Sequence, residues 1–83
     1  MNEKDFKYIE NRLNEVRQEK IKITYYKNDN KNYHLVGLKI NNRKTIKIQI
    51  NKRCCSYGYL IHKFNELINE EILKHELSKT SSL

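Results

Sequence analysis

Proline and tryptophan are absent from this 83-residue chain, and glycine and cysteine occur only twice each. A sequence with so little proline and glycine is neither collagen-like nor a low-complexity linker. A domain of this size buries only about 60% of its unfolded surface, so its core must be small. We expect a single α+β domain over residues 1–77 and a flexible C-terminal tail over residues 78–83.

Long apolar runs are also missing. No segment approaches the ~20 apolar residues of a membrane span, and the first ten residues, MNEKDFKYIE, are too charged for a signal peptide. The adjacent pair Cys54 and Cys55 excludes a disulfide framework and favours a reducing compartment. Even with His62 the cysteines do not supply four metal ligands. We expect a cytoplasmic protein that uses no membrane, metal or cofactor.

Acidic residues are scarce in the middle of the chain. Residues 20–53 contain ten basic residues and a single acid, Asp29, for a net charge of +9, whereas residues 1–19 and 54–83 each have a net charge of −1. The abundance of Lys, Asn and Ile, which have AT-rich codons, indicates a low-GC bacterium, phage or mobile element. Codon usage does not explain the segregation of charge, which favours a phosphate backbone or an acidic protein surface as partner.

Apolar residues at three- and four-residue steps predict a helix at each end of the chain, with Asn2 and Ser56 as N-caps. Their apolar faces consist of Phe6, Ile9, Leu13 and Val16 in the first helix, and of Tyr57, Leu60, Ile61, Phe64, Leu67, Ile68 and Ile72 in the last.

Between the helices the apolar period is two, which predicts strands at about 20–27, 33–40 and 45–51. If Asp29 and Asn30 form a two-residue turn, Tyr25 lies opposite His34 and Tyr26 lies opposite Tyr33. The next connection should be odd in length, about three residues, to keep the isoleucines on one side. The expected order is αβββα, a three-stranded antiparallel meander with both helices packed on one face.

A sheet covered on one side exposes its other face to water. The alternation places lysines and tyrosines together there, where the rings can stack on bases of a single strand or the sheet can enter a DNA groove. Gly37 on this face would let a ligand approach the backbone. A merely solvated basic face is the alternative. The candidate nucleic-acid-binding or partner-binding residues are Lys20, Lys22, Tyr26, Tyr33, Lys39, Arg43, Lys44, Lys47, Lys52 and Arg53.

Two further features lie outside this face. Lys52 and Arg53 precede the last helix, where free N–H groups suit a phosphate, although the two side chains would also simply keep a loop soluble. Tyr59, Leu73 and Leu77 lie on the far side of that helix from its apolar face. They form a candidate oligomer or partner patch, and a homodimer is one such partner.

No residues with a catalytic pattern are found. The cysteines lack a base and an orienting group, and His34 should point into the core beside Tyr25 as a structural histidine. We therefore expect a protein that is not an enzyme.

The order of elements resembles that of double-stranded-RNA-binding domains, whose last helix starts with a lysine-rich motif. Here that position reads NKRCCSYGYL, in which only Lys52 and Arg53 are basic. The order is also similar to that of the HicA type of toxin ribonuclease, in which a strand histidine is catalytic. His34 is the positional match, but Asn32 and Tyr33 stand where those enzymes have Gly-Ser. Small phage-encoded inhibitors of CRISPR effectors are similar in length and order. No family is identified.

These observations order three hypotheses. The first is a small non-enzymatic binding protein that engages DNA or RNA through the basic sheet face. The alternative is a protein-directed inhibitor or adaptor, for example an anti-CRISPR-type inhibitor, whose target is an acidic or nucleic-acid-binding protein. The third is a HicA-like ribonuclease.

Overall fold

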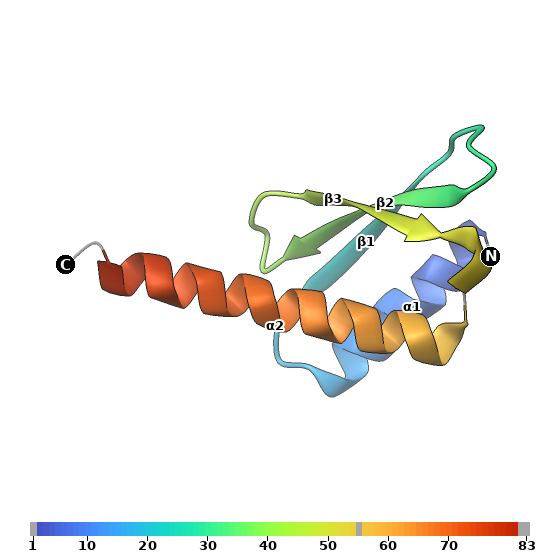
Figure 1. Ribbon diagram of the computed structural model, residues 1–83. Coiled ribbons are helices and arrows are strands. Elements are labelled where there is room, and N and C mark those ends of the chain that lie inside the picture. The colour runs from blue at the N-terminus through green and yellow to red at the C-terminus, as the bar shows by residue number, and fades with distance from the viewer. Residues whose placement is uncertain (1, 55, 82–83) are drawn as a thin grey trace.

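A computed structural model describes residues 2–54 and 56–81 of the chain. The elements follow in the order α1 (Glu3–Val16), β1 (Ile21–Tyr26), β2 (Tyr33–Ile40), β3 (Ile46–Asn51), a short 3-10 helix η1 (Lys52–Cys54) and α2 (Tyr57–Ser81). The strands form an antiparallel sheet in the order β1-β2-β3, and both helices lie on one side of it (Figure 1). The predicted α+β architecture is confirmed.

Helix α2 is the longest element, and its second half runs beyond the end of the sheet (Figure 1). It continues to Ser81, so residues 78–81, which were expected to belong to a tail, are helical. Residues 82–83 and Cys55 lie outside the described residues.

The inner face of the sheet, the side covered by the helices, carries the apolar residues expected there. The buried core comprises Phe6, Ile9 and Leu13 of α1, Ile21, Ile23, Val36, Leu38, Ile40 and Ile50 of the sheet, and Leu60, Phe64 and Ile68 of α2. Burying side chains of this kind contributes roughly 1.5–3 kcal/mol each. The core therefore lies entirely between the sheet and the helices, and it leaves the opposite face of the sheet free.

Two residues assigned to the apolar helix faces are not buried. Val16 is 66% exposed because it is the last residue of α1 and lies past the sheet. Tyr57 is 45% exposed; its ring packs against Tyr8 with centroids 4.9 Å apart, and its hydroxyl donates a hydrogen bond to the Asp5 carboxylate. That hydrogen bond lowers the pKa of Asp5. Tyr57 thus joins α2 to the start of α1 at the surface.

The β1–β2 register differs from the prediction by two residues. Tyr25 lies opposite Val36, and Tyr26 lies opposite Leu35, so the expected pairs of Tyr25 with His34 and Tyr26 with Tyr33 are wrong. The connection is longer because asparagine side chains hold it. Asn28 Oδ1 accepts the N–H of Asn30 at 2.8 Å, and Asn30 Oδ1 in turn accepts the N–H groups of Asn32 and Tyr33 at 2.7 and 3.2 Å.

A shift of two residues leaves every side chain on its predicted face, because the side-chain period of a strand is two. Leu38 lies opposite Ile46, and His34 lies opposite Ile50, which is the register that a three-residue β2–β3 connection gives. The predicted division into an apolar inner face and a polar outer face is therefore confirmed, although one register is wrong.

Side chains of α1 cover part of the open edge of β1. Glu10, which is only 6% exposed, accepts the N–H of Ile23 at 2.7 Å and also binds the Lys7 ammonium at 2.6 Å. Asn14 pairs with both the N–H and the carbonyl of Ile21, at 2.9 and 2.8 Å. An open edge strand is a template for unwanted strand pairing, and these bonds close it along half its length.

Replacement of Glu10 by alanine should destabilise the protein by about 1.5–3 kcal/mol, because it removes a charged acceptor from a buried N–H of the sheet. Urea unfolding measures this change. Glu15→Ala is the matched control, since Glu15 forms only an exposed ion pair with Arg12; we expect a loss of about 1 kcal/mol or less there. Equal losses in the two variants would contradict the edge-closing role of Glu10.

Candidate nucleic-acid interface

The outer face of the sheet, the side away from the helices, brings three lysines from three strands together. Lys22 on β1 lies opposite Lys39 on β2, and Lys47 on β3 lies opposite Gly37 in the next row. Like charges in directly opposed positions destabilise a sheet. The arrangement therefore works against the fold unless something negative offsets it.

Carboxylates of the protein do not offset this charge. Within residues 2–54 and 56–81, none of the ten basic residues of segment 20–53 forms an ion pair. The acids pair instead with cations on or next to the helices, for example Glu10 with Lys7 and Glu19 with Arg17. The outer face and its two ends are left with an uncompensated positive field, which attracts anionic partners.

Tyr26 lies across the middle of this face, over Gly37. A Cβ atom built on Gly37 would come within 2.9 Å of the Tyr26 Oη and 2.8 Å of Thr45 Cγ2. The prediction that a ligand approaches the Gly37 backbone is therefore wrong, since the glycine instead makes room for the tyrosine ring. Lys47 Nζ lies 5.8 Å from the ring centroid, within cation–π range. The sheet thus presents a fixed aromatic ring beside a cation.

Tyr33 extends the aromatic surface toward the other end of the sheet. It lies two residues before Leu35, the residue opposite Tyr26, so the two tyrosines are diagonal neighbours and not a direct pair. Diagonal neighbours on one face are about 7–8 Å apart. Tyr26, Tyr33 and the intervening Leu35 are all half-buried. Together they form a continuous strip of rings and aliphatic side chain among the lysines.

The remaining predicted cations lie at the ends of the sheet. Lys20 precedes β1, where its backbone forms two hydrogen bonds with Asn41, and Arg43 and Lys44 lie in the β2–β3 connection. Lys52 and Arg53 form η1 at the opposite end. The structure therefore distributes the ten predicted binding residues over the outer face and two flanking sites.

The η1 end contains a cavity of about 290 Å³ lined by Lys31, Asn32, Asn51, Lys52 and Arg53. Lys52 Nζ donates to the carbonyl of Asn30 at 2.6 Å, so it ties the β1–β2 connection to η1. Ser56 Oγ accepts the N–H of Tyr59 at 3.2 Å, which uses part of the predicted phosphate site for capping. Sequence reasoning missed Lys31 here because the register of the preceding loop was wrong.

His34 is buried at 5% exposure, as predicted. Its Nδ1 lies 3.3 Å from the hydroxyl of Tyr25, and the Phe6 ring meets it edge-on with centroids 5.6 Å apart. Burial lowers the pKa of His34, and the nearby charge of Lys52 acts in the same direction. A HicA-like role would require this imidazole to reach a phosphodiester, and its burial under α1 does not favour that role.

The apolar patch predicted on α2 is exposed but not continuous. Tyr59, Leu73 and Leu77 are 44%, 57% and 58% exposed. Tyr59 lies 14 residues before Leu73, a separation of about 21 Å along the helix axis, and Lys63 Nζ covers its ring at 5.9 Å. Leu73 and Leu77 alone are adjacent, one turn apart, so self-association through the three residues together stays a prediction.

Within the described part of the chain, no three His, Cys, Asp or Glu side chains gather to hold a metal ion. In the same part, neither helix has the length and apolar character needed to cross a bilayer.

Comparisons with protein-family models, with curated proteins and with solved structures found no match to this chain. Its function is therefore argued from the geometry of the site.

The burial of His34 predicts a specific pH dependence of stability. In the unfolded chain His34 takes up a proton near its ordinary pKa of 6.5, whereas the folded protein resists protonation because its pKa is lowered. The stabilisation is complete above the unfolded pKa and is lost as the pH falls below it, by at most about 1.4 kcal/mol per pH unit. Urea unfolding between pH 7 and 5 should show a shallower decline for His34→Gln than for the wild type. The exposed His62 provides the control variant His62→Gln, and an unchanged slope in His34→Gln would refute this assignment.

Proposed function

We propose that the protein is a small non-enzymatic nucleic-acid-binding protein that engages DNA or RNA with the outer face of its sheet. One observation carries the proposal: Lys22, Lys39 and Lys47 share a face that no carboxylate neutralises. Phosphates supply the missing negative charge, and contacts with phosphates provide most of the affinity of such proteins.

The aromatic strip favours a single strand as the ligand. Exposed rings among cations stack on unpaired bases, and such stacking tolerates any sequence because every base has a flat face. The ring of Tyr26 is held over Gly37 beside Lys47, so it needs no rearrangement before a base stacks on it. A reducing cytoplasm, which the adjacent cysteines favour, is the compartment where such strands occur.

The charge-reversal variant Lys22→Glu/Lys47→Glu should lose at least tenfold in affinity for single-stranded oligonucleotides, and its affinity should depend less on salt because fewer counterions are released. Fluorescence anisotropy of labelled DNA and RNA at several salt concentrations measures both effects.

Lys4→Glu/Lys63→Glu is the matched control, because it changes the net charge equally but lies on the helices. Equal losses in both variants would show that only overall charge matters. No binding by the wild type to any DNA or RNA, together with a stable complex with a target protein, would favour the inhibitor or adaptor alternative.

Tyr26 provides a separate test of base stacking. Tyr26→Leu should weaken binding to a single strand by about tenfold, within the 1–3 kcal/mol that stacking contributes per base, while the salt dependence stays unchanged. The same anisotropy titrations check both numbers. Tyr59→Leu, which removes an exposed tyrosine from α2, is the control. A Tyr26→Leu protein that binds like the wild type would leave only the phosphate contacts.

A further inference from the structure

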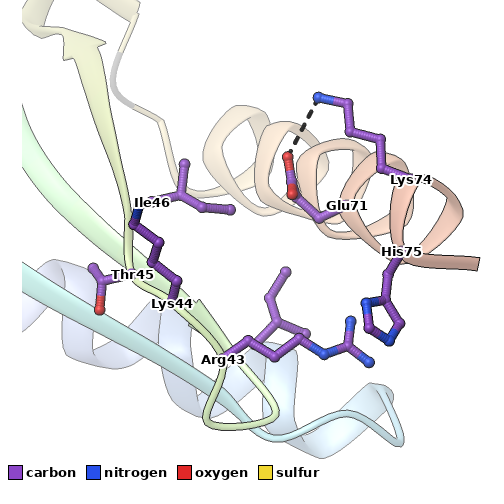
Figure 2. Close-up of a pocket in the computed structure, with 8 residues that line it drawn as sticks. Arg43, Lys44, Thr45, Ile46, Glu71, Lys74 and His75 are labelled. Atoms are coloured by element: carbon purple, nitrogen blue, oxygen red, sulfur yellow. Dashed lines mark hydrogen bonds and ion pairs between the residues drawn. The ribbon is translucent and has the colours of Figure 1, made fainter. Parts of the chain in front are cut away.

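A pocket of about 550 Å³ lies between the β2–β3 connection and the second half of α2 (Figure 2). Its volume falls within the range of small-molecule sites in proteins. We call it the turn pocket; it is lined by Ile40, Arg43, Lys44, Thr45, Ile46, Glu71, Lys74 and His75. Glu71, Lys74 and His75 did not belong to any site predicted from the sequence.

The pocket exists because the inward stripe of α2 changes its chemistry. Leu60, Phe64 and Ile68 of this stripe are completely buried against the sheet. One turn further, the helical period brings Glu71 and then His75 to the same side of the helix. Both are half-buried and line the pocket where α2 runs past the sheet (Figure 1). Apolar residues at these two positions would extend the core, and the polar pair leaves room for a ligand instead.

The opposite wall is formed by a fixed turn. Asn41 and Asn42 adopt positive φ values of 51° and 61°, and the N–H of Arg43 donates to the carbonyl of Ile40 at 3.0 Å. Asparagine tolerates this left-handed conformation better than most residues do. Two hydrogen bonds of 2.8 Å between Asn41 and Lys20 attach the turn to the start of β1. The turn therefore holds Arg43 so that its guanidinium points toward His75 across the pocket (Figure 2).

The charges of the pocket select an anion. Glu71 is its sole acid, and its carboxylate pairs with Lys74 Nζ at 3.5 Å. Arg43 and Lys44 have no carboxylate partner within the described residues. A guanidinium offers paired N–H donors that match the oxygens of a phosphate.

The wall behind these cations is apolar. Ile40 and the half-buried Ile46 line it, so it accepts a ring or another apolar group once water is displaced. The ligand therefore needs two parts, a strongly anionic group and an apolar body.

We propose that the turn pocket binds a small phosphorylated aromatic molecule, the chemical class to which nucleoside monophosphates belong. Arg43 and Lys44 hold the phosphate, and Ile40 and Ile46 contact the ring. The ligand is a free mononucleotide or the phosphorylated 5′ end of a strand, because both present the same chemistry. The proposal does not depend on the outer face, since different residues carry it.

An NMR titration of the isotope-labelled protein tests this site. Adenosine 5′-monophosphate should shift the amide signals of Arg43, Ile46 and His75, and adenosine alone and inorganic phosphate alone should each bind at least tenfold more weakly. A 5′-phosphorylated trinucleotide that displaces the monophosphate would identify a strand end as ligand, and failure to displace it would assign the site to free small molecules.

Three variants sharpen the test. Arg43→Gln should weaken binding of the monophosphate at least tenfold, and Glu71→Gln should strengthen it severalfold because a negative charge leaves the pocket. Arg12→Gln, which changes an exposed arginine on α1, should bind within twofold of the wild type.

Equal weakening in Arg43→Gln and Arg12→Gln, or inorganic phosphate binding as tightly as the monophosphate, would overturn the proposal. So would shifts confined to the outer face. Signals of Lys22 and Lys47 report that face separately, so the failure of this site and the failure of nucleic-acid binding are distinguishable.

Discussion

The constraint on which this structure depends is the strict alternation of side chains along three strands that are covered on one side only. Alternation sends Ile21, Ile23 and their counterparts into the core, and it sends Lys22, Lys39 and Lys47 to the other face. A lysine cannot join the core without losing its hydration, so each isoleucine that the helices bury fixes its neighbours outward. The charged face is therefore a direct consequence of how the core forms.

The same constraint explains which sequence predictions were reliable. The faces of the strands were predicted correctly even though the β1–β2 register was wrong by two residues, because a shift of two preserves the alternation. The pair of Tyr26 with Tyr33 was wrong because hydrogen bonds of Asn28 and Asn30 lengthen the connection. A pattern of apolar residues contains no information about such local side-chain bonds.

Features that depend on the relative lengths of elements were not predicted. The spacing of Glu71 and His75 continues the apolar stripe of α2, but only the end of the sheet decides that these positions line a pocket and not the core. Likewise, the contact of Tyr26 with Gly37 requires the actual register. The glycine in the middle of β2 was the available signal, since a strand interior normally disfavours glycine unless something else approaches closely.

The fold accepts an electrostatic cost on its outer face and recovers stability elsewhere. Lys22 and Lys39 face one another without a carboxylate between them, whereas Glu10 and Asn14 provide hydrogen bonds to the edge of β1. One acid moved from a helix to the outer face would relieve the repulsion, yet the acids of the described chain stay with the helices and the Arg17–Glu19 segment. Since the repulsion gives the fold nothing, the distribution makes physical sense when an anionic partner supplies the missing charge, and this is the strongest reason to relate the outer face to binding.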